Sequence, residues 1–174
     1  FSLIAVVVAG MSALAGPIGT AVQPRLTSLL SQGKSEEMIA LYKKATQFVS
    51  VIGFAVAGTV ALFSTELLYA WTGDMEASLW AGNILFWYAL GNGLLMILAF
   101  QYYLQFAYGN LKYHIWGNTI FGFVQIIVMI IAVYTYGALG AGIAWFTLQA
   151  IFLSFWPGYI HSKFAKGIHK NWMM

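Results

Sequence analysis

Long apolar stretches separated by short polar segments dominate this sequence. About 20 apolar residues are enough for a helix to cross the hydrocarbon core of a bilayer, and five stretches reach that length. The expected spans cover residues about 1–22, 46–71, 79–106, 115–134 and 138–160, and a polar tail follows at 161–174. The pattern predicts an all-α fold, a polytopic transmembrane helix bundle with about five spanning helices.

The longest polar interruption, QPRLTSLLSQGKSEEMIALYKK at 23–44, separates the first two expected spans. Ser35 is expected to cap a short helix, with Glu36 and Glu37 in the first turn, where the helix dipole favours anions. The apolar residues that follow lie near one face and the lysines near another. Two interpretations remain open, an amphipathic helix on the membrane surface and a solvated loop helix.

Small residues recur four positions apart in several expected spans. Such rows let two helices approach closely in a membrane, where lipid supplies no hydrophobic driving force between them. We therefore expect close packing along the run GALGAGIA at 137–144 and along three rows. The rows are Ala5, Ala9 and Ala13; Ser12, Gly16 and Thr20; and Gly53, Ala57 and Ala61. The short turn TYG at 135–137 predicts that the last two spans form an antiparallel hairpin.

Composition supports the membrane interpretation, because 61% of the residues are hydrophobic and 7% are charged. Soluble domains have about a quarter of their residues charged. The chain has no cysteine, so it offers neither a disulfide nor a thiolate ligand for a metal.

The lysines and arginines, eight in all, fall on one predicted side of the membrane. Four lie at 23–44, one at 108–114 and three in the tail, whereas the link at 72–78 and the turn at 135–137 have none. By the positive-inside rule this side is cytoplasmic, so the chain is expected to start outside and to end in the cytoplasm. Cations spread over short segments form no continuous basic face, and we expect no nucleic-acid partner.

Polar residues inside the expected spans are mostly amides. Catalytic motifs such as HExxH or GxSxG and paired carboxylates are missing, so we expect neither an enzyme nor a metal or cofactor site. Glu66 is expected near the membrane interface. Buried amides either bond neighbouring helices or line a polar cavity, and both interpretations remain open here. The amides are Asn83, Asn92, Gln101, Gln105, Asn118 and Gln125.

Four segments, PRLTSLLSQGKSEEMIALYKKAT, ELLYAWTGD, GNLKYHIWGNT and YGALGAGIA, resemble the polysaccharide transporter family of the multidrug, oligosaccharidyl-lipid and polysaccharide exporter superfamily. The chain looks like a bacterial O-antigen flippase. The resemblance implies that these spans are the last five of a twelve-helix, two-lobed transporter, a C-terminal part that begins inside a longer protein. It also implies the bacterial cytoplasmic (inner) membrane as the location.

The function implied by this resemblance is transport for O-antigen or lipopolysaccharide biosynthesis. An undecaprenyl-diphosphate-linked oligosaccharide would be flipped from the inner to the outer leaflet by alternating access, with membrane lipid and polysaccharide polymerase machinery as further partners. Cations near the cytoplasmic mouth would bind the diphosphate, and amides would bind sugar hydroxyls. The diphosphate candidates are Arg25, Lys112 and His114, and the sugar candidates are Asn92, Gln101, Gln105, Asn118 and Gln125.

Other interpretations remain open at this point. Arg25 and Lys112 could serve only to anchor the topology. The chain could instead belong to a cation-coupled multidrug exporter of the same superfamily, or to a membrane assembly subunit that transports nothing.

Overall fold

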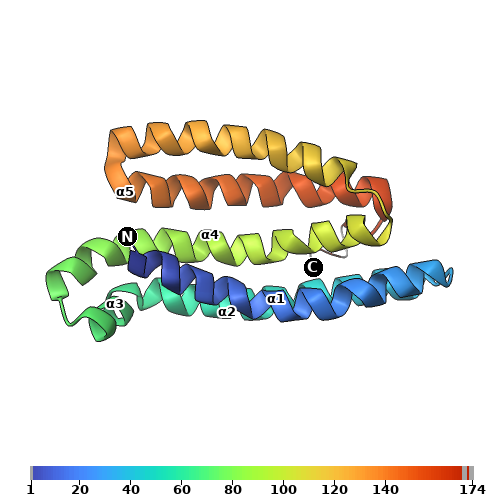
Figure 1. The fold of residues 1–174 in the computed structure, drawn as a ribbon, viewed down its shortest axis with the longest axis horizontal. Helices are drawn as coiled ribbons and strands as arrows, with labels where there is room; N and C mark the ends of the chain where they lie inside the picture. Colours follow the sequence, from blue (N-terminus) through green and yellow to red (C-terminus); the bar gives the residue numbers. More distant parts are fainter. Residues whose placement is uncertain (1, 170–171, 173–174) are drawn as a thin grey trace.

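The structure is a computed structural model, and it describes residues 2–169 and 172. The described residues fold into five helices. They are α1 (Ser2–Ser31), α2 (Ser35–Leu62), α3 (Ser64–Thr72), α4 (Met75–Ala107) and α5 (Lys112–Phe164) (Figure 1). The described residues contain no strand, so the predicted all-α class is confirmed. By length and composition, four of these helices could cross a membrane, which is consistent with a membrane protein.

The longest helix, α5, folds back on itself at Gly137 (Figure 1). This residue has φ 63° and ψ −151°, a conformation that is essentially restricted to glycine. The two arms, 112–136 and 138–164, are antiparallel, and the rings of Phe121 and Phe152 stack between them at 4.2 Å. Each arm has about 25 residues, enough to cross a bilayer. The predicted hairpin is therefore confirmed.

Two helices extend into the segment that was expected to be a polar loop. α1 continues to Ser31, and α2 already begins at Ser35, because a helix satisfies its own backbone hydrogen bonds in water as well as in lipid. Gly33, with φ 75°, ends α1: its N–H donates to the Leu30 carbonyl at 3.0 Å, and the next N–H, of Lys34, donates to the Leu29 carbonyl at 2.9 Å. This is the Schellman pattern of helix termination.

The start of α2 corrects two expectations. Ser35 is the first helical residue, and the capping position belongs to Lys34, which makes no side-chain cap hydrogen bond. Glu36 and Glu37 do lie in the first turn. The segment is neither a surface helix nor a solvated loop helix, because Met38 and Tyr42 are completely buried in the bundle. Those apolar side chains, spaced one turn apart, gain more from packing than from contact with headgroups.

The far end of α2 also differs from the expected span at 46–71. The helix ends at Leu62, and after Phe63 a separate short helix, α3, begins. Glu66 lies exposed in the first turn of α3.

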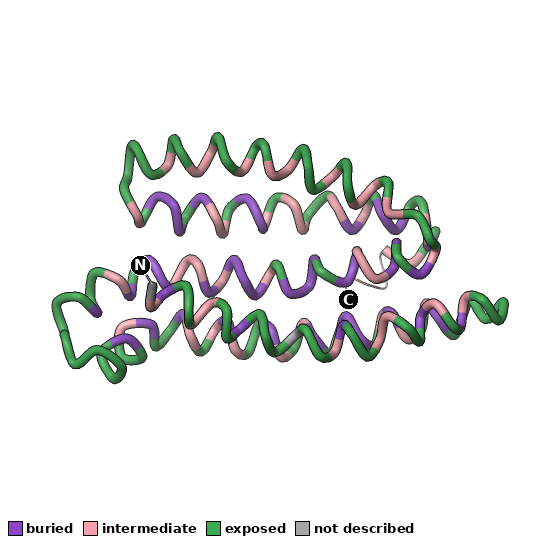
Figure 2. Tube along the Cα trace, in the orientation of Figure 1, coloured by how far each residue is buried: buried purple, intermediate pink, exposed green. Residues whose placement is uncertain are grey.

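α4 is the central helix and packs against all the others. Figure 2 shows buried positions along its whole length. One core cluster joins Leu26, Met38, Phe100, Leu104 and Ile160 near one end of the bundle, and a second joins Ile4, Leu68, Ile84 and Leu85 near the other. The other helices thus pack onto α4 along its length, at both ends of the bundle.

Small residues bring α2 and α5 close to α4, as predicted. A β-carbon at Gly93 would lie 2.7 Å from Cβ of Ala57, and one at Gly142 would lie 3.2 Å from the Ile84 carbonyl oxygen. Ala57, Ala61, Gly140, Ala141 and Ala144 are buried. Close packing of the α1 rows is wrong for this structure, because Ala5, Ala9, Ala13, Ser12, Gly16 and Thr20 are all exposed. α1 instead turns its larger apolar residues, Ile4 and Met11, toward the core, which buries more apolar area.

The two ends of the bundle differ in charge. The connections 32–34 and 108–111 and the C-terminal segment lie at one end, and the 73–74 link and the turn at Gly137 lie at the other (Figure 1). We call the first the basic end, since every described lysine and arginine lies toward it: Arg25, Lys34, Lys43, Lys44, Lys112, Lys163 and Lys166. Lys170 lies outside the described residues. Glu66, Asp74 and Glu76 lie toward the opposite, acidic end.

The expected polar tail does not begin at residue 161. α5 continues to Phe164, and His161 is only 1% exposed. Its Nε2 lies 2.9 Å from the hydroxyl of Tyr42, and its Nδ1 lies 3.2 Å from Nδ1 of His169. These contacts fold the segment after α5 back against the helices of the basic end.

Candidate binding groove along α4

Three adjoining cavities follow one face of α4, and we call them together the α4 groove. Their volumes are about 330, 230 and 280 Å³. Leu95 lines all three, and Asn92 lines the first two. The first two lie between α4 and α1, the first reaching Trp145 of α5, and the third lies between α4 and both arms of α5.

The floor of the groove follows from helical spacing. Tyr88, Asn92, Leu95, Ala99 and Tyr103 recur every three or four residues, so they share one face of α4. Leu95 and Ala99 are exposed because neither α1 nor α5 covers the middle of this face. The small residues of α1 that were expected to pack tightly form one wall instead, and their size leaves the space open: Ala5, Ala9, Ser12 and Gly16.

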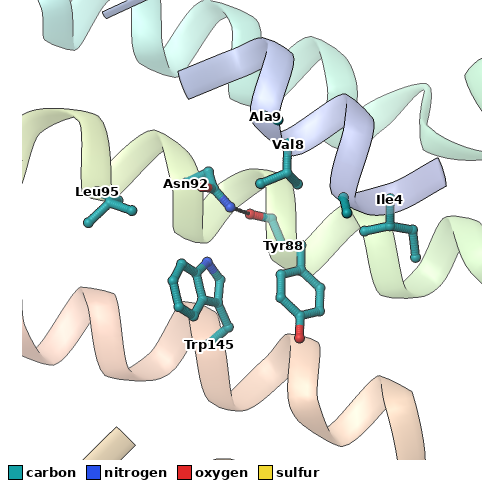
Figure 3. Close-up of a pocket in the computed structure, with 8 residues that line it drawn as sticks. Ile4, Val8, Ala9, Tyr88, Asn92, Leu95 and Trp145 are labelled. Atoms are coloured by element: carbon teal, nitrogen blue, oxygen red, sulfur yellow. Dashed lines mark hydrogen bonds between the residues drawn. The ribbon is translucent and has the colours of Figure 1, made fainter. Parts of the chain in front are cut away.

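The cavity between α1, α4 and α5 is shown in Figure 3. Asn92 is 3% exposed, and its side-chain amide donates a 2.8 Å hydrogen bond to the backbone carbonyl of Tyr88. The ring of Trp145 faces the groove from α5 and stacks on Tyr88 with ring centroids 6.1 Å apart. A polar side chain thus lies between apolar walls on α1 and an aromatic wall on α5.

The third cavity, which we call the α5 cavity, receives a stripe of side chains from each arm of α5. The first arm contributes His114, Asn118, Phe121, Gly122 and Gln125, and the second contributes Trp145, Gln149, Phe152 and Trp156. Asn118 donates to the backbone carbonyl of His114 at 2.8 Å, and its amide nitrogen also lies 3.0 Å from Nδ1 of that histidine. Both stripes repeat every three or four residues, so each faces one direction along its arm.

Half of the candidate residues named from the sequence line the groove: Asn92, His114, Asn118 and Gln125. Gln101 and Gln105 do not. They lie nine and thirteen positions after Asn92, about half a turn away around α4, and both are buried. Gln105 donates to the Gln101 carbonyl at 3.0 Å. Arg25 and Lys112 are exposed and line none of the three cavities.

Sequence reasoning missed Gln149 and Trp145, which line the α5 cavity from the second arm. The available signal was a single amide in an otherwise apolar span, one turn after a tryptophan. Intramembrane polar residues tend to mark functional positions, and Gln149 carries the same signal as Asn92.

The groove is lined without Asp, Glu, Lys or Arg. Aliphatic side chains and aromatic rings form most of its lining, and its polar groups are amides, hydroxyls and His114. Among the described residues no group of three His, Asp or Glu side chains could hold a metal ion. What this arrangement offers chemically is reversible binding of a neutral ligand that has both polar edges and apolar faces.

Comparison with protein-family models, curated proteins and solved structures finds no significant match to this chain.

Proposed function

We propose that this chain is part of a membrane transporter that moves an undecaprenyl-diphosphate-linked oligosaccharide from the inner to the outer leaflet. The observation that carries the proposal is the α4 groove, a neutral, amide-bearing and aromatic groove along a helix long enough to span the membrane. The sequence resemblance to oligosaccharide flippases points to the same class of substrate.

A sugar that crosses a bilayer must exchange its hydrogen bonds with water for other partners, because an unsatisfied hydroxyl in hydrocarbon costs several kcal/mol. Asn92, Asn118, Gln125 and Gln149 offer such partners along the groove. The polyprenyl tail needs no polar partner. It can remain in lipid beside the apolar outer surface of the bundle, as at Phe123, Ile127 and Ile130.

The diphosphate requires cations, which the groove lacks. Arg25 of α1 and Lys112 of α5 lie exposed toward the basic end, where they can attract a phosphate group at the loading side. We assign the loading side to the cytoplasm, as the positive-inside rule predicts. In the alternating-access scheme the groove faces the cytoplasm first and the outside afterwards, by rocking against a second lobe.

The test is a flipping assay with the full-length protein reconstituted in lipid vesicles. A fluorescent undecaprenyl-diphosphate-linked oligosaccharide should move between leaflets, and an undecaprenyl phosphate without sugar should move much more slowly. Equal rates for both lipids, or no movement of either, would contradict the proposed substrate.

The role of Arg25 is tested in cells. Arg25→Ala in the full-length protein should reduce delivery of lipid-linked glycan to the outer leaflet about tenfold, since a charge-assisted hydrogen bond contributes about 1.5–3 kcal/mol. The amount of protein in the membrane should not change. Lys44→Ala is the matched control, because Lys44 is also exposed near the basic end but lies on α2, whereas Arg25 lies on α1, the helix that forms one wall of the groove. Normal surface polysaccharide with Arg25→Ala would refute this role.

A further inference from the structure

Gln149 is a buried polar residue of α5 whose side-chain oxygen lacks a hydrogen-bond partner in the described part of the chain. It is 2% exposed, and its Oε1 has no hydrogen-bond partner among the described residues. The buried Nε1–H of Trp145, one turn earlier, also has no partner. A buried polar atom without a partner is destabilising. Both residues line the α5 cavity, so its wall contains one acceptor and one donor that the described helices leave without a partner.

Aromatic rings form an apolar side of the same cavity. Phe121, Phe152 and Trp156 stack in sequence, at 4.2 and 5.2 Å between ring centroids and with interplanar angles of 23° and 15°. The three rings form one stacked apolar column beside the cavity, while Asn118, Gln125 and Gln149 supply polar groups at other positions. A sugar ring has the matching chemistry, since its C–H faces are apolar and its hydroxyl edges are polar.

Volume and charge narrow the class of ligand. At about 280 Å³ the cavity lies near the lower limit of ligand sites, about 300 Å³, so it has room for one ring rather than for several. It is lined by no lysine, arginine or carboxylate, and His114 is its one imidazole. A phosphate would therefore lose its hydration without gaining a permanently charged cation.

We propose that the α5 cavity is a subsite for one uncharged sugar ring, in which Gln149 and Trp145 form the hydrogen bonds and the column of Phe121, Phe152 and Trp156 forms the apolar wall. This inference rests on the proposed function, and it separates the site of the sugar from the site of the diphosphate. Gln149 accepts from a ring hydroxyl, and Trp145 donates to a ring or hydroxyl oxygen.

The direct test uses purified full-length protein in lipid nanodiscs and saturation-transfer NMR. The probes are glucose, galactose, N-acetylglucosamine and inorganic phosphate. At least one sugar should bind and phosphate should not compete with it. Gln149→Leu should weaken sugar binding at least about tenfold, because the hydroxyl loses its partner inside the cavity, and Trp145→Phe should weaken it about threefold or more. Gln47→Leu, the same change at an exposed position of α2, should have no effect.

Three results would contradict the proposed sugar subsite. Binding that is unchanged in Gln149→Leu, competition by phosphate, or no sugar binding to the native protein even at high millimolar concentration would overturn it. If Gln149→Leu fails to fold, Trp145→Phe, which keeps an aromatic ring in place, decides whether the subsite exists.

The flipping assay separates the proposed subsite from the proposed transport function. Normal flipping by a Gln149→Leu protein would refute the subsite alone, whereas sugar binding that depends on Gln149 without flipping by the native protein would refute the function alone.

Discussion

Tyr42 and His161 join α2 to the end of α5 through one buried hydrogen bond. The hydroxyl and Nε2 lie 2.9 Å apart, and both side chains are almost completely buried. His161 also contacts His169, beyond the end of α5. This bond therefore helps to hold the C-terminal segment against the bundle.

Removing the hydroxyl should destabilise the protein. Tyr42→Phe keeps the ring but leaves a buried imidazole nitrogen without its partner, at a cost of about 1–3 kcal/mol. The midpoint of thermal unfolding in detergent should fall. Tyr134→Phe is the matched control and should leave the midpoint unchanged, since Tyr134 is 92% exposed. Equal midpoints for both variants would show that the bond to His161 contributes nothing.

The sequence predicted which types of residue line the candidate site, but it did not predict which face of α4 forms the site. Asn92 and Gln101 are both amides in one span, and helical spacing alone separates them by half a turn. Which face stays open depends on where α1 and α5 pack, and that is decided by contacts between residues far apart in the chain. Asn92 therefore lines the groove, whereas Gln101 is buried outside it.

At the level of helices, the sequence predicted the number and order of apolar segments better than their ends. Hydropathy marks where a chain leaves lipid, and a helix need not end there. α1 continues through Arg25 to Ser31 for this reason. The helix break at Phe63 was not predictable, because no proline or glycine lies next to it in the sequence. The hairpin was predictable because Gly137 follows a short polar turn between two apolar runs.

The reversal of α5 depends on one backbone conformation. Gly137→Ala should destabilise the hairpin by about 1–3 kcal/mol, because a side chain is strained at φ 63° and ψ −151°. Gly58→Ala is the control. Gly58 lies inside α2 with nothing within 4 Å of its would-be β-carbon, so alanine should be neutral or slightly stabilising there. Thermal unfolding of the two variants compares them, and an equal stability would mean that the turn accepts a side chain.

For the whole molecule, the separation of charge between the two ends predicts its orientation in the membrane. The chain has no native cysteine, so single cysteines can report each end. Ser31→Cys, at the basic end, should react with a membrane-impermeant maleimide only after the cells are opened. Asp74→Cys, in the link at the acidic end, should react in intact cells. Labelling of residue 31 from outside would reverse the orientation.

The hairpin of α5 also bears on how the protein enters the membrane during synthesis. Between Lys112 and Lys163 the sequence has no Asp, Glu, Lys or Arg, and the turn at Gly137 is only a few residues long. In the orientation that the positive-inside rule predicts, carrying this turn across the bilayer requires no charge to be dehydrated, whereas Asp74 and Glu76, at the start of α4, must cross as charged groups. We expect the two arms of α5 to leave the insertion machinery as one unit, with the stacked rings of the α5 cavity already paired when they reach α4.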